Sequence, residues 1–159
     1  ELVFPMKKQT ATEPIWCEAL RVGHTRIDAE HEEFAGLIQQ LLHADGNALA
    51  PVLDALVMHA SVHFAEEDAW MQRLDFPAMH CHQREHEAVL ASADGVRRRL
   101  QAGETLPAGQ FAAALADWFP AHVQYLDSAL AQWICKHTWN AKPVVLHRHK
   151  PVAQVMSHS

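Results

Sequence analysis

Apolar and polar residues follow one another along most of the chain at intervals of three or four, the period of an amphipathic α-helix. Four segments show this spacing, and we expect helices over residues 28–43, 48–74, 77–101 and about 108–136. The intervening Ala44–Asn47, Asp75–Pro77 and Ala102–Pro107 carry the Gly, Pro, Asn and Asp typical of turns. No segment alternates with period two, so no strand is predicted. Four helices joined by short loops predict an all-α, up-down-up-down antiparallel four-helix bundle.

Three residues bear on where these helices begin and bend. Asp28 suits an N-cap of the first helix. Pro51 is tolerated in the first turn of the second helix. Pro120 lies inside the fourth helix and cannot donate the backbone hydrogen bond to Ala116, which predicts a kink or a bulge.

The length and composition predict one domain with terminal extensions. The chain has 159 residues, 49% of them apolar, which is enough for one buried core. We expect a lead-in over residues 1–11, in which Met6 marks the natural start on one interpretation, and a bundle over 12–136. Residues 137–159 form a basic tail, and the sequence leaves open whether it packs on the bundle.

Charge and cysteine content exclude several classes of function. The formal net charge is −6 with no basic stretch before the tail, so nucleic-acid binding is not predicted. No apolar run approaches the length of a membrane span, and the first twelve residues lack the apolar region of a signal peptide. The three cysteines form no C-x-x-C pair, so we expect a reducing cytoplasm. Cys81, between two histidines, is the one best placed to react.

Histidine is the unusual component, with 13 in 159 residues. Seven imidazoles and carboxylates interrupt the apolar faces of the four helices: His31, His63, Glu67, His82, His86, His122 and Asp127. The i, i+4 pairs project within about 40° of each other. His122 and Asp127 are separated by about 140°, so the aspartate is expected to reach sideways, for example to bridge two metals. Each unpaired buried polar group costs roughly 1–3 kcal/mol, which coordination of iron, zinc or manganese would offset.

Each of these residues also has a plainer interpretation. His31 alone would be a hydrogen-bonded core histidine, and an i, i+4 pair alone a solvated contact. The metal hypothesis gains its weight from the combination across all four helices. His59 could instead pair with His63 around zinc, and Glu66 competes with Glu67. The remaining histidines are expected to lie outside the site: His24 and His43 exposed at the ends of the first helix, His80 about 200° from His82, and His137, His147, His149 and His158 in the tail.

The ordered H…HxxxE…HxxxH…HxxxxD pattern resembles the hemerythrin family, in particular the bacterial single-domain hemerythrins. The similarity covers about Trp16 to Trp133. The matching segments are Val22-Gly23, Ile27–His31, His63–Glu67, Phe76-Pro77, His82-x3-His86 and Trp118 followed by His122-x4-Asp127.

The resemblance implies a non-haem di-iron centre. One iron would be held by His82, His86 and His122, and the other by His31 and His63, which leaves it one open coordination position. Glu67 and Asp127 would bridge the two irons together with an oxo or hydroxo group. In the family, O2 binds end-on at the open iron and is held as a hydroperoxide when both irons become ferric.

The donor set favours reversible O2 binding for storage, delivery or sensing over catalysis. Di-iron oxidases of the ferritin-like bundles use four carboxylates and two histidines, whereas this chain offers two carboxylates and five histidines. Four apolar residues are candidates for a wall that keeps water out: Leu56, Trp70, Trp118 and Leu126.

Three alternatives remain open. The first is a redox enzyme with the same centre, such as a peroxidase, an NO or nitrite reductase or an iron-dependent oxidase. The second is a regulatory module whose basic tail contacts a partner. The third is a zinc-only bundle. NO is an alternative gas ligand, and the sequence defines no protein partner and no membrane association.

Overall fold

The computed structural model describes residues 14–139, and the regular secondary structure of these residues is helical, with short turns and loops between the helices. The long helices are α1 (Thr25–His43), α2 (Leu49–Arg73), α3 (Met79–Gln101), α4 (Leu106–His122) and α5 (Ser128–Trp139). Short 3-10 turns, η1 (Glu18–Leu20) and η2 (Gly46–Ala48), precede α1 and α2, and the π-helical segment η3 (Val123–Asp127) joins α4 to α5. The predicted lead-in (1–11) and tail residues 140–159 lie outside the described residues.

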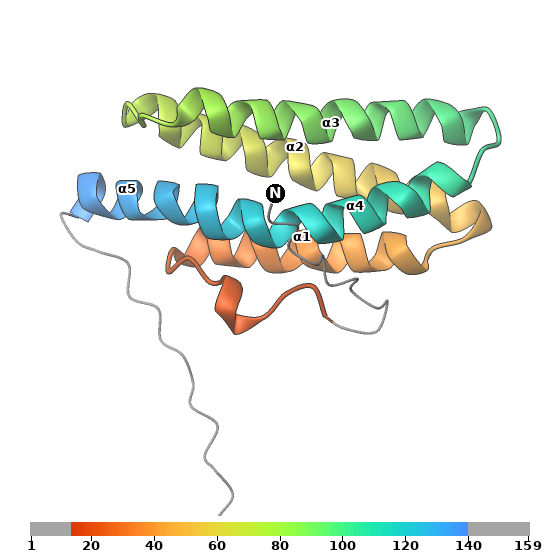
Figure 1. Cartoon of the computed structure of the whole chain (residues 1–159), viewed down its shortest axis with the longest axis horizontal. Coiled ribbons are helices and arrows are strands. Elements are labelled where there is room, and N and C mark those ends of the chain that lie inside the picture. The colour runs from red at the N-terminus through yellow and green to blue at the C-terminus, as the bar shows by residue number, and fades with distance from the viewer. Residues whose placement is uncertain (1–13, 140–159) are drawn as a thin grey trace, which may run out of the picture.

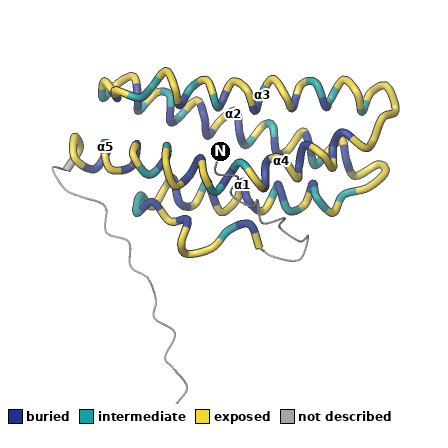
Figure 2. Tube along the Cα trace, in the orientation of Figure 1, coloured by how far each residue is buried: buried dark blue, intermediate teal, exposed yellow. Residues whose placement is uncertain are grey.

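The helices form the predicted up-down-up-down bundle, with α4, η3 and α5 as one long fourth rod (Figure 1). Neighbouring rods pack as α1 with α2, α2 with α3, α3 with α4, and α4 with α1, which closes the ring. Buried positions line the inward faces of all four rods (Figure 2). The largest fully buried apolar side chains are Ile27, Phe34, Ile38, Leu41, Leu53, Leu56, Met71, Phe119 and Leu130.

The first helix begins three residues earlier than predicted, and Asp28 is not its N-cap. His24 caps α1, with Nδ1 accepting the backbone N–H of Ile27 at 3.3 Å. Asp28 lies in the first turn, where its buried carboxylate accepts the backbone N–H groups of Val22 at 2.8 Å and Gly23 at 3.2 Å. The acidic residue therefore anchors the incoming loop while the histidine satisfies the helix end. His24 is half-buried, so the expectation that it is exposed is wrong.

The turn between α3 and α4 follows the predicted Gly-Pro region. Gly103 has φ 87°, and its N–H donates to the carbonyl of Leu100 while that of Glu104 donates to Arg99. This is the Schellman pattern, in which a residue with positive φ reverses the chain and glycine carries no steric cost. The reversal sends α4 back along α3.

The fourth rod differs from the single α-helix predicted over 108–136. Backbone N–H groups run in α-helical pairing to His122, then η3 widens the turn over five residues before α5 resumes. Pro120 lies two residues before the end of α4, so the predicted bulge occurs immediately beyond it. A π-turn inserts one residue into the helix and shifts the register of everything after it.

One helix contradicts the expectation about membrane-length apolar runs. The stretch Gly46–Arg73 reaches a mean hydropathy of 1.4 over an 18-residue window, so its length and composition would allow a membrane crossing. Exposed apolar side chains, among them Met58 and Val62, raise this value on the outer face. In the bundle the helix packs on α1 and α3 and buries His63 and Glu67, as a core helix does.

Candidate metal centre

The buried polar residues of residues 14–139 are eight, and seven of them are the predicted ligands: His31, His63, Glu67, His82, His86, His122 and Asp127. The eighth is Asp28, whose role in the loop is described above. None of the seven exposes more than 4% of its surface. All four rods therefore contribute polar side chains to one water-excluded centre.

Glu67 on α2 lies between two groups of imidazoles. Its Oε1 is 3.4 Å from Nε2 of His63, one turn earlier on the same helix. Its Oε2 is 3.4 Å from Nε2 of His82 and 3.3 Å from Nε2 of His86, both on α3. The two oxygens of one carboxylate thus face different sets of donors.

Asp127 repeats this arrangement from the fourth rod. Its Oδ2 lies 3.0 Å from Nε2 of His31, and its Oδ1 lies 2.9 Å from Nε2 of His82 and 3.1 Å from Nε2 of His122. The π-turn makes this possible. In an α-helix the five-residue spacing would direct His122 and Asp127 about 140° apart, whereas η3 brings both side chains to the same side of the rod. The expectation of a sideways reach is corrected in this respect.

The donors form two overlapping groups that can each hold a metal ion. Their ligand atoms lie within 4.8 Å of one another in each group. The first group is Glu67, His82, His86, His122 and Asp127, and the second is His31, His63 and Glu67. Glu67 belongs to both groups, which places two adjacent coordination sites side by side.

The hydrogen bonding of these atoms fits a metal better than it fits the protein alone. Both ring nitrogens of His31, His82 and His86 and both oxygens of Glu67 are buried without a hydrogen-bond partner. Nε2 of His82 and Nε2 of His86 lie 3.4 Å and 3.3 Å from Oε2 of Glu67, yet none of these atoms makes a hydrogen bond. Buried polar atoms are normally paired, so a cluster of orphans is costly. Imidazole nitrogens and carboxylate oxygens are donors that divalent first-row metals accept.

Electrostatics keep both carboxylates ionised. Burial and the neighbouring Asp127 act to raise the pKa of Glu67, but nearby imidazoles, His63 foremost, bring it to about 2. Burial opposes ionisation of Asp127 too, yet His122 holds its pKa well below the ordinary value. Burial lowers the pKa of His63 to about 4. For His82, burial acts in the same direction, but the carboxylates of Asp127 and Glu67 raise the pKa to about 9. The centre thus holds two buried anions that attract a cation.

Aromatic rings surround the His31 and His63 side of the centre. Phe119 packs edge-on against His31 with ring centroids 5.5 Å apart, and Trp16 lies 6.2 Å from the same ring. Phe64 lies 5.9 Å from His63 and also stacks on His86 at 3.9 Å. Of the predicted wall residues, Leu56 is fully buried and the others are half-buried: Trp70, Trp118 and Leu126.

Sequence reasoning missed the carboxylates that lie behind two of the predicted ligands. Glu85 accepts from Nδ1 of His122 at 2.7 Å and from Nε1 of Trp118 at 3.1 Å. Asp68 lies 3.5 Å from Nδ1 of His86. Both acids directly adjoin a ligand in sequence, Glu85 before His86 and Asp68 after Glu67. They lie off the inward stripe, so helical periodicity does not mark them.

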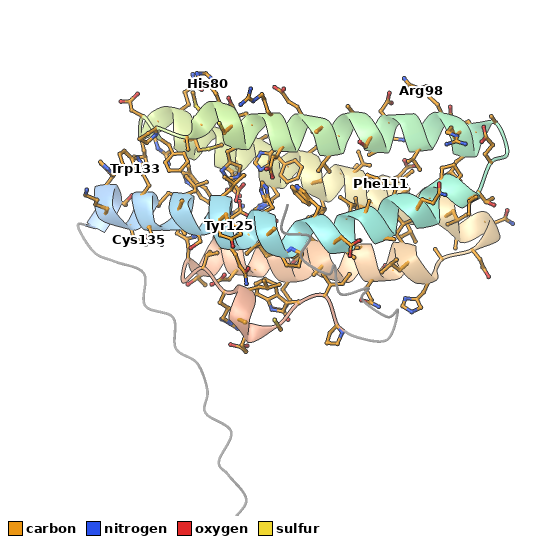
Figure 3. All side chains as sticks on the ribbon, viewed as in Figure 1. His80, Arg98, Phe111, Tyr125, Trp133 and Cys135 are labelled. Atoms are coloured by element: carbon orange, nitrogen blue, oxygen red, sulfur yellow. The ribbon has the colours of Figure 1, made fainter. Side chains whose placement is uncertain are left out.

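The competing candidates lie outside the centre. Glu66 pairs with Arg26 at 2.7 Å, and His80 is exposed and points outward from α3 (Figure 3). His43 is exposed, as predicted. His59 donates from Nε2 to the carbonyl of Glu30 at 3.0 Å and stacks beside His63, with ring centroids 6.3 Å apart. The three cysteines are free, with Cys81 exposed and receiving an N–H from Arg84 at 3.4 Å.

The fold and the donor set define a class: a four-helix bundle whose core holds a cation-binding centre of imidazoles and carboxylates. The family model described as the hemerythrin HHE cation binding domain matches residues 22–134, a range that contains all seven residues. The chain belongs to the hemerythrin family.

Individual relatives agree with this assignment. The chain is 38% identical over 127 residues to a bacteriohemerythrin of Ralstonia nicotianae, which covers 80% of this chain and 93% of the relative. It is 28% identical to a bacteriohemerythrin of Stenotrophomonas maltophilia, over 77% of this chain and 82% of the relative. A myohemerythrin of Riftia pachyptila is 25% identical over 71% of this chain and 87% of its own length. No solved structure gives a significant match.

Proposed function

We propose that this chain binds O2 reversibly at a non-haem di-iron centre. In this proposal one iron is held by His82, His86 and His122, the other by His31 and His63, and the bridging ligands are Glu67, Asp127 and an oxo or hydroxo group. The observation that carries it is the geometry of the two carboxylates. Each directs one oxygen toward the three-imidazole group and the other toward the two-imidazole group.

The unequal number of imidazoles creates the place for a gas ligand. With both carboxylates shared, the His31 and His63 side has one protein donor fewer than the His82, His86 and His122 side. Two ferrous irons would supply the two electrons, and the bridging hydroxo group the one proton, that O2 takes up when it is held as a hydroperoxide. The protein's part is to provide the open side and to keep its surroundings dry.

The side chains around that open side favour binding without turnover. Phe34 packs against both Phe64 and Phe119. Phe64 in turn contacts His63, and Phe119 contacts His31. These rings cannot donate a proton and exclude water. Proton transfer to a bound reduced ligand is therefore disfavoured, and its release as O2 is favoured.

The test combines an iron assay with absorption spectra of the reduced protein under argon, in air and again under argon. The proposal predicts two irons per chain and peroxide-to-ferric charge-transfer bands that appear with O2 and vanish when O2 is removed. A ferric spectrum that forms at once and never reverses would contradict reversible binding. Absence of bound iron would contradict the di-iron centre.

One observation favours a redox enzyme as the second candidate. His59 stacks beside His63, remains partly exposed and lies 3.6 Å from the carboxylate of Glu33, so it offers a titratable group between solvent and the open side. Steady turnover of peroxide that is lost in His59→Phe would support catalysis. The same experiment without turnover in either protein would favour the carrier.

We also propose that the protein works in a reducing cytoplasm, because its three cysteines are free.

A further inference from the structure

The imidazoles of the centre differ in what lies behind them. Nδ1 of His122 donates to Oε2 of Glu85 at 2.7 Å, while its Nε2 points inward, 3.1 Å from Asp127. Nδ1 of His31 and Nδ1 of His63 have no hydrogen-bond partner within the described chain. Nδ1 of His82 and Nδ1 of His86 have no hydrogen-bond partner either, so a hydrogen-bonded carboxylate supports one imidazole, His122, on the three-imidazole side and none on the two-imidazole side.

Glu85 is fixed by two donors from the fourth rod. Its Oε2 also accepts the indole N–H of Trp118 at 3.1 Å, and that indole packs on the His122 ring with centroids 4.3 Å apart. Glu85 and Trp118 line one end of a surface hollow of about 380 Å³ between α3 and α4. The arrangement links α3, which carries Glu85, to α4, which carries both rings.

The chemistry of this contact has a definite direction. An ionised carboxylate only accepts, so Nδ1 of His122 must carry the proton and Nε2 is left free for a metal. A carboxylate behind a ligating imidazole also raises the basicity of that ligand, which stabilises the more positive metal. Asp68 supports His86 more weakly, since 3.5 Å exceeds the length of a good hydrogen bond.

We propose that Glu85 is a positioning residue for His122 and makes the two metals electronically unequal, with ferric iron favoured on the His82, His86 and His122 side. This inference rests on the proposed di-iron centre. It assigns the more easily oxidised metal to the side that lacks the open position, and it adds a residue that the ligand pattern does not contain.

The test uses Glu85→Gln in the iron-loaded full-length chain. Glutamine can still accept the N–H of His122 but removes the negative charge. We expect two irons to remain and the preference for ferric over ferrous iron to fall on the order of tenfold, a rise of about 59 mV in a one-electron potential. Glu87→Gln removes the same charge from an exposed position two residues away, and we expect it to leave the potential unchanged.

A second variant keeps the test decisive if Glu85→Gln releases iron. Trp118→Phe keeps an aromatic ring beside His122 but removes the indole N–H that holds the Glu85 carboxylate in place. Because Glu85 is then less firmly positioned against Nδ1 of His122, we expect a smaller shift in the same direction. Equal potentials in the wild-type protein and Glu85→Gln would overturn the inference, as would iron loss in Glu85→Gln without a shift in Trp118→Phe. Lack of iron in the wild-type protein would instead refute the proposed function itself.

Discussion

The inward faces of the helices bury aliphatic side chains in one half of this bundle and a cluster of imidazoles and carboxylates in the other. One half contains η2 and the turn that connects α3 to α4. There the rods meet through aliphatic side chains such as Ile38, Leu41, Leu53 and Leu115. In the other half the same helical stripes continue as His31, His63, Glu67 and their partners. Removal from water is enough to stabilise the packing of the apolar half. The buried nitrogen and oxygen atoms of the polar half also need a bonding partner.

This contrast assigns separate tasks to the halves. The apolar half holds the rods in register without help from a ligand. Under the proposed function, a cation satisfies the buried donors of the polar half, so we expect the stability of that half to be coupled to metal binding. The predictions below test that division, beginning with the change expected to have the largest effect.

A ligand substitution and a core substitution should act differently. His82→Ala is expected to lose iron and with it more stability than an ordinary cavity costs, because binding free energy is folding free energy here. Leu53→Ala in the apolar half should cost about 2–5 kcal/mol and keep the iron. Iron assays and urea unfolding distinguish them. His80→Ala, on the outer face, is the matched control for His82→Ala and should change neither quantity.

Removal of the metal should separate the halves directly. After chelation we expect amide hydrogen exchange to accelerate around His63, His86 and η3, while the amides near Leu41 and Leu53 keep most of their protection. The physical reason is that only the polar half loses its partner atoms. Uniform acceleration along all four rods would show that the halves do not behave independently.

Pro120→Ala sharpens the account of the π-turn. Alanine at position 120 restores a backbone N–H that can donate to the carbonyl of Ala116, and it removes a residue that is unfavourable inside a helix by about 3 kcal/mol. We therefore expect the unfolding free energy to rise by about 1–3 kcal/mol. We expect two irons to remain bound because His122 stays at the end of α4 and Asp127 at the end of η3. Loss of iron in this variant would mean that Pro120 sets the register of the π-turn.

The smallest effect concerns the entrance to α1. Burial lowers the pKa of His24 from 6.5, and Asp28 and Glu66 only partly oppose this. His24 therefore binds a proton more readily in the unfolded chain than in the folded one. Its contribution to the free energy of unfolding is lost as the pH falls from about 6.5 through its folded pKa. His24→Asn keeps a good N-cap without titrating. Urea unfolding at pH 7.5 and pH 5 should show a smaller loss of unfolding free energy between the two pH values in the variant than in the wild-type protein. An equal loss in the two proteins would contradict the predicted effect of His24 protonation.

The sequence was sufficient for much of the fold because helical periodicity survives in tertiary context. The i, i+4 pairs His63–Glu67 and His82–His86 were predicted correctly as inward-facing, since α2 and α3 keep α-helical geometry there. The relation between His122 and Asp127 was not predictable in this way. A π-turn has no composition of its own, and an α-helical projection separates the pair.

Residues that contact the centre from beside or outside the inward-facing stripe of a helix were also not predicted from the sequence. Glu85 reaches His122 from the flank of α3, and Trp16 reaches His31 from the segment before α1. Asp28 had the composition of an N-cap, but the loop amides of Val22 and Gly23 competed for its carboxylate. In each case the partner lies on another segment of the chain, and the spacing of residues within one helix cannot predict such a contact.

The most direct measurement is anomalous diffraction from crystals of the iron-loaded protein at the iron absorption edge. The account predicts two iron peaks, both in contact with Glu67 and Asp127, one beside His82, His86 and His122 and the other beside His31 and His63. A single peak, or a pair of peaks that does not share the two carboxylates, would contradict the proposed centre.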